Sequence, residues 1–172
     1  MKLTEVNPRQ VIALRDYPLH DNRFLELYYS IYKQGGGNLL APVPVIAIGE
    51  VLDYLKGYSR DCMFRDFKPV HPDSDYFLID GNHRSIAAAL AGKPIFAMWI
   101  REKADLMEAH RLQEQGGMTG WANIPFTIGD LAYGLANHHA TTDRFMTVEE
   151  KAIMLAKNNQ LPRYIIEEFC SK

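Results

Sequence analysis

The chain has 172 residues, of which 47% are hydrophobic and 23% are charged, and its formal net charge is −2 at pH 7. This length and apolar content predict a globular fold with one main core. The charge balance excludes the broad basic field with which many proteins neutralise the phosphates of nucleic acids.

The cysteine pattern and the hydropathy indicate a compartment. Cys62 and Cys170 lie far apart and have neither the spacing of a metal site nor that of a redox pair. We therefore expect two free thiols in a reducing environment. The first residues contain no apolar segment typical of a signal peptide, and no stretch is long enough to cross a bilayer. These observations predict a cytoplasmic protein that does not engage a membrane.

The first hundred residues predict strands and helices in alternation. Asp21 or Asn22 can cap the first helix, and the glycine run from Gly35 ends it. Pro42 and Pro44 indicate either the start of the second strand or an edge strand. Strands are expected at residues 10–14, 42–48, 76–79 and 94–100, helices at 23–34, 49–58 and 82–91, and an irregular surface segment at 59–75.

The rest of the chain predicts helices only. Thr127 can cap a helix, and Thr147 with Glu150 three residues later forms the pattern of a capping box. These helices are expected at residues 102–115, 128–138, 147–158 and 162–169. We therefore predict an α/β (α+β) fold in which an α/β domain, residues 1–100, is followed by a helical extension, residues 101–172.

The segment Asp80-Gly81-Asn82-His83-Arg84 is the most informative part of the sequence. It lies where an apolar strand meets an alanine-rich helix that stops at Gly92. The first turn of a helix has free backbone N–H groups and the positive end of the helix dipole. Such a turn is a ready site for phosphate, and His83 and Arg84 add further donors.

Each residue of this segment also has a purely structural interpretation. Gly81 can be a plain turn glycine, Asp80 a helix cap, and His83 a buried histidine bonded to the backbone. Arg84 opposes the dipole at the start of a helix, so we expect it to face an anion or an acid. Beside a phosphate, Asp80 can also bind Mg²⁺ or position a hydroxyl group.

Two further features remain open in the helical part. His138 and His139 are adjacent and do not share a helix face, so they suggest a helix end rather than a metal pair. Trp121 lies in a glycine-rich loop with no evident core role, where it could cover a ligand or a partner surface.

The order of elements and the segment at residues 80–84 resemble the ParB/sulfiredoxin-like superfamily over roughly residues 8–100. The spacing Gly81-x-x-Arg84-x-x-Ala87 looks like the phosphate-binding box of ParB proteins. The resemblance implies a small mixed-sheet domain in which the helix N-terminus holds nucleotide phosphates. It assigns phosphate binding to Gly81, Asn82, His83, Arg84 and Ser85.

The chain departs from parts of this family in instructive ways. Asn82 stands where sulfiredoxins have a catalytic Cys, so we do not expect sulfinic-acid reduction. Asn82 and Ile86 replace the Glu and Arg of the ParB proteins that hydrolyse CTP. The box is closest to the Asp-Gly-His-His-Arg form of a free-serine kinase, whose base is an N-terminal carboxylate. Here that acid is Asp16 or Asp21, and the alignment does not choose between them.

The favoured hypothesis is a kinase-like, nucleotide-dependent phosphotransferase or nucleotide hydrolase that acts on a small-molecule acceptor. It would use ATP, ADP or CTP with Mg²⁺. Asp80 would bind the metal, and Asp80, His83 and either Asp16 or Asp21 would form the catalytic set.

Two alternatives remain, and a homodimer is open in each. A ParB-like, DNA-associated regulator could use residues 147–169 as a helix-turn-helix. Against it, residues 101–172 carry eight Lys or Arg and ten Asp or Glu, whereas a reader of DNA is expected to be basic. The second alternative is a non-catalytic binding domain. It is compatible with Asn82, which stands where other members of the family have Cys or Glu.

Overall fold

The computed structural model describes residues 2–55, 60–116, 121, 123–140 and 142–171, the side chains of residues 60–62 excepted. Within these residues a mixed five-stranded sheet has the order β1-β5-β3-β4-β2. The fold is therefore α+β, as predicted. The strands are β1 (Lys2–Val6), β2 (Val11–Ile12), β3 (Val43–Ala47), β4 (Tyr76–Leu78) and β5 (Ile95–Ile100).

β3 is the central strand, which corrects the edge interpretation of its prolines. It runs parallel to β5 and antiparallel to β4. Pro44 has no N–H, but its carbonyl accepts a hydrogen bond from the backbone N–H of Ile79 at 3.0 Å. A proline that takes part in the ladder through its acceptor is compatible with a central position, although such positions are uncommon.

The two outer strands differ most from the prediction. The sequence analysis missed β1, which pairs antiparallel with β5 and exposes most of its side chains. β2 is shorter than the strand expected at residues 10–14, because Pro8–Gln10 forms a 3₁₀ helix capped by Asn7. β2 pairs parallel with β4 on one side. On its other side, Ala13 N–H donates to Met146 O at 2.9 Å.

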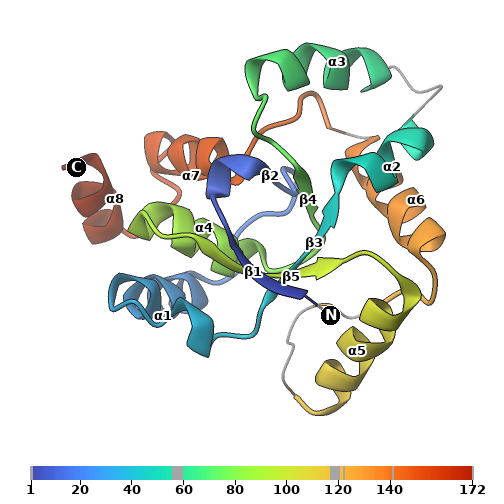
Figure 1. Ribbon diagram of the computed structural model, residues 1–172. Helices are drawn as coiled ribbons and strands as arrows, with labels where there is room; N and C mark the ends of the chain where they lie inside the picture. The colour runs from blue at the N-terminus through green and yellow to red at the C-terminus, as the bar shows by residue number, and fades with distance from the viewer. Residues whose placement is uncertain (1, 56–59, 117–120, 122, 141, 172) are drawn as a thin grey trace.

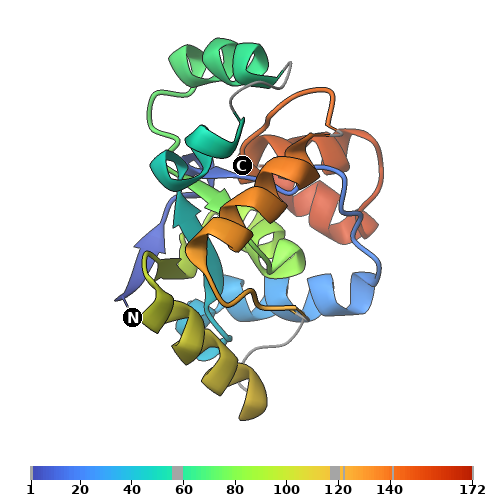
Figure 2. The ribbon, with the colours of Figure 1, turned by 90° about the vertical axis from the view of Figure 1, so that its right-hand side faces the viewer.

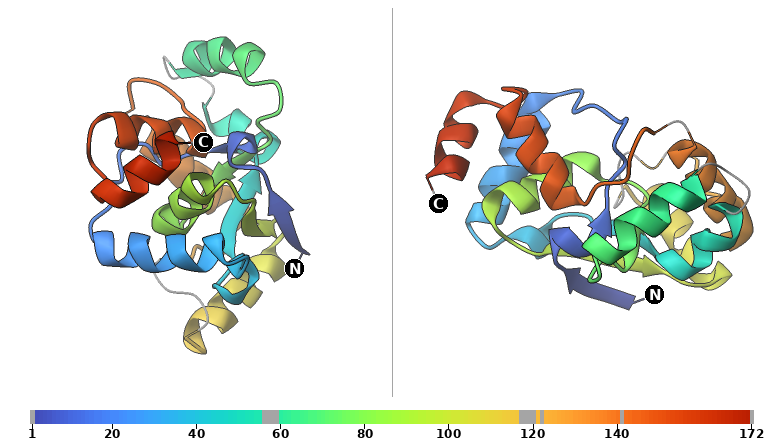
Figure 3. Two further views of the ribbon diagram at one scale, coloured as in Figure 1. Left: turned by 90° about the vertical axis from the view of Figure 1, so that its left-hand side faces the viewer. Right: turned by 90° about the horizontal axis from the view of Figure 1, so that it is seen from above.

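Helices cover both faces of the sheet (Figure 1). The left panel of Figure 3 views the sheet from the side that is on the left in Figure 1, and the helices of that face are in front. Figure 2 views it from the opposite side, where α2, α5 and α6 are in front. The left-hand face carries α1 (Asn22–Lys33), α4 (Asn82–Ala91), α7 (Val148–Lys157) and α8 (Arg163–Cys170). The other face carries α2 (Ile48–Leu55), α5 (Lys103–Glu114) and α6 (Ile128–His139), with α3 (Arg60–Val70) above them.

The helix ends follow the predicted caps. Asp21 accepts a hydrogen bond from Arg23 N at the start of α1, and Thr127 accepts one from Asp130 N at the start of α6. Thr147 and Glu150 form the capping box of α7. The predicted end of the second helix, at residues 56–58, lies outside the described residues. At the β4–α4 junction, His83 accepts a hydrogen bond from Asp21 N–H of the α1 cap, and Asn82 accepts one from Lys151 of α7.

α3 was not predicted, since residues 59–75 were expected to be irregular. Phe64 and Phe67 lie three residues apart on one face of this helix and are buried. They pack against Phe145, with ring centroids 5.6 and 6.0 Å away, and Phe64 also stacks on Phe77. This aromatic packing stabilises a helix that carries several charged residues and a proline near its end.

Residues 1–100 and 101–172 share one hydrophobic core. Buried Ile12 and Phe77 belong to the same cluster as Val148 and Leu155. A division into two domains at residue 100 stays a prediction, but both parts of the chain contribute to the region described next. Of the two cysteines, Cys170 is a free, exposed thiol, and the side chain of Cys62 lies outside the description. In the described part of the chain, no helix has the length and apolarity needed to cross a membrane.

Candidate functional site

The β4–α4 junction is built around Gly81. Its φ of +87° lies in the left-handed region, which side chains disfavour. A Cβ at this position would also lie 3.1 Å from both Arg84 Nη2 and Val43 Cγ2. The junction therefore needs glycine for its backbone conformation and for the close approach of its neighbours.

The first turn of α4 offers backbone donors. The first hydrogen bond of the helix runs from Ser85 N–H to Gly81 O at 2.8 Å. The N–H groups of Asn82, His83 and Arg84 precede it, so the helix itself supplies no acceptor for them. Together with the helix dipole they favour a negative group at this end.

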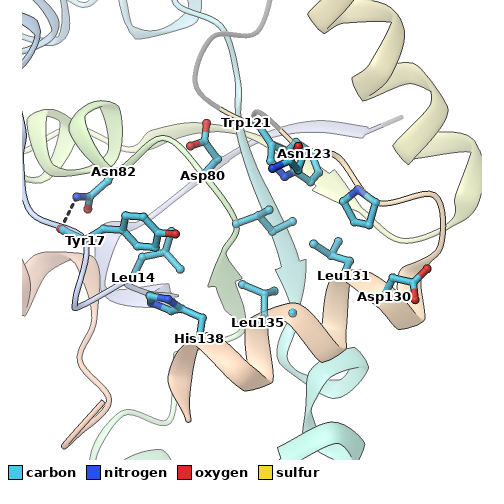
Figure 4. Close-up of a pocket in the computed structure, with 13 residues that line it drawn as sticks. Leu14, Tyr17, Asp80, Asn82, Trp121, Asn123, Asp130, Leu131, Leu135 and His138 are labelled. Carbon is cyan, nitrogen blue, oxygen red and sulfur yellow. Dashed lines mark hydrogen bonds between the residues drawn. The ribbon is translucent and has the colours of Figure 1, made fainter. Parts of the chain in front are cut away.

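A cavity of about 410 Å³ opens beside this turn (Figure 4). Its walls come from the segment after β2, the β4–α4 junction, and α6 with the residues that precede it. The labelled side chains in Figure 4 surround a common space, with Asp80 and Trp121 on the side opposite α6. The lining consists of Leu14, Tyr17, Ile79, Asp80, Asn82, Trp121, Asn123, Pro125, Asp130, Leu131, Gly134, Leu135 and His138.

Aromatic rings form part of the cavity wall. Tyr17 stacks on His138 with ring centroids 5.0 Å apart and an angle of 28° between the planes. Trp121, which was unexplained in the sequence, is only 8% exposed. Its carbonyl accepts a hydrogen bond from Gln113 Nε2 at 2.6 Å, which ties this segment to α5. The cavity thus offers flat apolar surfaces as well as the polar atoms of Asp80 and Asn82.

Arg84 is hydrogen-bonded to Asp80 and does not line the cavity. Its guanidinium donates to Asp80 Oδ2 at 3.2 Å and to Ala41 O at 2.8 Å, and the residue is 3% exposed. The acid expected opposite Arg84 is therefore a carboxylate of the same junction. Burial raises the pKa of Asp80 above its ordinary value, although Arg84 and His83 act in the opposite direction.

Asn82 connects the start of α4 to two other segments. Its Nδ2 donates to Tyr17 O at 2.8 Å, as the dashed line in Figure 4 marks. Its Oδ1 accepts from Lys151 Nζ at 3.0 Å. Asn82 lines the cavity while both ends of its amide are bonded to protein groups.

His83 faces the start of α1. Its Nε2 accepts a long hydrogen bond, 3.5 Å, from Asp21 N–H, and its ring lies edge-on to Phe24. Burial lowers the pKa of His83, which favours the neutral ring that this acceptor role requires. Ser85 is buried and donates its hydroxyl to Asn82 O at 3.1 Å. Among the described residues that line the cavity, neither His83 nor Ser85 appears.

The two candidate N-terminal acids have different surroundings. Asp21 caps α1 and forms an ion pair with Arg23 at 2.7 Å, which lowers the pKa of Asp21 to about 2. Asp16 lines a second, smaller pocket of about 320 Å³, whose lining also includes Tyr17 and Lys151. Its charge acts on both Lys151 and His138, so Asp16 is the acid coupled to the cavity wall.

The described lining of the cavity offers single carboxylates rather than a complete set of metal ligands. No group of three or more His, Cys, Asp or Glu side chains that could hold a metal occurs in the described residues. Mg²⁺ usually keeps several waters and binds one or two carboxylates together with substrate phosphates. Asp80, which lines the cavity beside the first turn of α4, is suited to supply one such carboxylate.

The sequence analysis missed Lys151 and Tyr17 and did not assign His138 to a site. His138 does lie in the last turn of α6, as expected, but it also lines the cavity. Lys151 falls on the buried face of α7 between Val148 and Leu155. A lysine at an apolar helical position was the signal that could have identified it.

Comparisons with models of protein families, with curated proteins and with solved structures found no match to this chain.

Proposed function

We propose that this chain binds a nucleotide in the cavity at the β4–α4 junction, with the phosphates at the first turn of α4. The observation that carries the proposal is that the 410 Å³ cavity is lined by Asp80 and by Asn82, the first residue of that turn. A volume of this size lies within the range typical of small-molecule sites. The resemblance of residues 80–84 to a nucleotide-binding box supports the same choice.

The two ends of the cavity suit the two ends of a nucleotide. Trp121 and the stacked pair of Tyr17 and His138 provide flat surfaces for a base. The turn at Asn82 provides N–H groups and a positive dipole end for phosphate. The Asp80 carboxylate would repel phosphate, and Mg²⁺ bound between the two groups would offset that repulsion.

The reaction we infer is transfer of a phosphoryl group to a small acceptor or to water. Bound Mg²⁺ would neutralise the charge that develops on the phosphates. The chain's own contribution is to hold the phosphates at the helix turn and to keep Asp80 in place through Arg84. Asp16 lines the second pocket rather than this cavity, and His83 is turned toward α1. Of the predicted catalytic residues, Asp80 is therefore the one best placed to orient an acceptor hydroxyl.

The DNA-associated alternative is the weaker one. α7, which would belong to the helix-turn-helix, packs against α4. Its most central cation, Lys151, is 1% exposed and bonded within the protein. A recognition element needs exposed cations for phosphate contacts. No feature of α7 or α8 specifically favours DNA over the cavity ligand.

Calorimetry with ATP, ADP and CTP, each with and without Mg²⁺, tests the proposal. We expect binding to the native chain and a matching rise in its melting temperature. Trp121→Ala should weaken binding about tenfold or more, since a base loses a stacking surface. Phe126→Ala is the control, because Phe126 is highly exposed and is absent from the described lining.

Two outcomes would decide between the hypotheses. If no nucleotide binds at millimolar concentration with Mg²⁺, the proposal is wrong. If nucleotide binds but ³¹P NMR shows no product with water or with a panel of hydroxyl-bearing acceptors, the chain is a non-catalytic binding protein.

A further inference from the structure

Lys151 is a buried lysine at the meeting point of three segments. It belongs to α7 and is 1% exposed. Its Nζ donates to the backbone carbonyls of Leu14 at 2.5 Å and of Tyr17 at 2.8 Å. It also donates to Asn82 Oδ1 at 3.0 Å. One ammonium group thus joins α7 to the segment after β2 and to the first turn of α4.

These contacts use the whole donor capacity of the group. An ammonium carries three N–H bonds and no acceptor, and the three contacts employ all three. Lys151 therefore has no N–H left for a phosphate. Its contacts also set the orientation of the Asn82 amide, because Oδ1 faces Lys151 and Nδ2 faces Tyr17 O.

All three acceptors are uncharged, so none of them is a counter-ion that would offset the free-energy cost of burying the ammonium group. A buried charge without a directly bonded counter-ion costs free energy unless hydrogen bonds compensate for it. The charge of Asp16, in the segment after β2, acts on Lys151, and the charge of Lys151 acts in turn on His83 of α4 and His138 of α6. An uncharged side chain would cost less here, so the position calls for a role beyond packing.

We propose that Lys151 is a positioning residue of the nucleotide site, which fixes the segment of residues 14–17 to the first turn of α4. This inference rests on the proposed function. Through Tyr17 O the ammonium holds the residue whose ring stacks on His138 and forms a wall of the cavity. Through Asn82 it holds the residue at which the phosphate-binding turn begins.

The first test compares Lys151→Met with Lys157→Met, a matched control at an exposed position of the same helix. Hydrogen exchange without nucleotide should show lost protection at residues 13–19 in Lys151→Met and native protection in Lys157→Met. Affinity for ADP with Mg²⁺ should fall about tenfold in Lys151→Met only. Unchanged exchange and unchanged affinity in Lys151→Met would overturn the inference.

A double-mutant cycle gives a second, independent readout. Asn82→Ala should weaken ADP binding by itself, and adding Lys151→Met should weaken it little further, because both remove the same connection. Fully additive effects would show that the two residues act separately and would contradict the proposal. If Lys151→Met fails to fold, Asn82→Ala alone still tests the link, since it should raise exchange at Tyr17 and its neighbours.

The pH profile separates positioning from packing. Burial lowers the pKa of Lys151 to about 8, so ADP affinity should decline between about pH 7 and about pH 9 as the ammonium loses its proton. The pKa values of His83 and His138 are lowered, so neither titrates in that window. Lys151→Arg, which stays charged, should bind ADP with an affinity independent of pH in this range. A native-like decline in Lys151→Arg would refute the assignment.

Together, these experiments distinguish failure of the proposed function from failure of the positioning role of Lys151. If the native chain binds no nucleotide, the proposed function is wrong, and the exchange experiment still decides whether Lys151 fixes residues 14–17. If the native chain binds ADP and Lys151→Met binds it equally well, the function stands and the positioning role is wrong.

Discussion

Arg84 Nη2 lies 3.2 Å from Asp80 Oδ2, one helical turn away, and the same guanidinium donates to Ala41 O. This pair places the most buried cation of the β4–α4 junction on a carboxylate that lines the cavity. In the function we propose, Arg84 would therefore act on the ligand through Asp80. A phosphate at the first turn of α4 would then be bound by backbone N–H groups rather than by a guanidinium.

Loss of this arginine should destabilise the fold. Arg84→Met leaves Asp80 and Ala41 O without their donor, and breaking a buried pair typically costs about 3–5 kcal/mol. We expect about 3 kcal/mol, since 23% of the Asp80 side chain is exposed to solvent. Urea denaturation measures this change. The double variant Arg84→Met/Asp80→Asn should recover part of the loss, and an equal loss in both variants would show that the pair does not matter.

Gly81 should tolerate no side chain. Gly81→Ala places a Cβ at φ +87° and 3.1 Å from Val43 Cγ2, which we expect to lower the free energy of unfolding by about 1–2 kcal/mol. Gly49→Ala is the control, because a Cβ at Gly49 in α2 meets nothing within 4 Å. It should raise stability by about 0.5–1 kcal/mol. Equal effects of the two substitutions would contradict the role of Gly81.

Local sequence signals predicted α4 and its surroundings well. The alanine run, the glycine at each end and the abrupt change from apolar to polar residues at Asp80 make this helix recognisable from its own sequence. The capped starts of α1, α6 and α7 were predictable for the same reason, since a cap is read from three or four neighbouring residues.

The elements that were missed depend on distant contacts. β1 has a mixed, mostly exposed surface, and its pairing with β5 joins the two ends of the α/β part. α3 depends on the packing of Phe64 and Phe67 against Phe145. The cavity could not be predicted because its wall combines the β4–α4 junction with His138 and Trp121, which lie tens of residues further along.

The free energy of unfolding should depend on pH because of Lys151. Its pKa falls from the ordinary 10.5 to about 8 on folding, so between these values the unfolded chain binds more protons than the folded chain. The free energy of unfolding should therefore rise with pH in this window, by up to about 1.4 kcal/mol per pH unit.

Denaturation of Lys151→Met isolates this contribution from other groups that titrate in the same range. The variant should lack the rise, and Lys157→Met should retain it. An identical pH dependence in all three proteins would show that Lys151 is not strongly perturbed. The expected result also means that the charge which orders the site reduces the stability of the fold, a trade-off seen at functional positions.

Gly134 allows the cavity to be filled without disturbing the core. It lies in α6, lines the cavity, and offers open space to an added Cβ. Gly134→Phe should lower nucleotide affinity about tenfold or more, because an aromatic side chain would occupy the space we assign to the base. Stability should not fall, since replacing a helical glycine is worth about 0.5–1 kcal/mol. Gly49→Phe, at an equally open and exposed helical position that does not line the cavity, should leave affinity unchanged. Calorimetry beside thermal denaturation measures both quantities, and full affinity in Gly134→Phe would place the nucleotide outside this cavity.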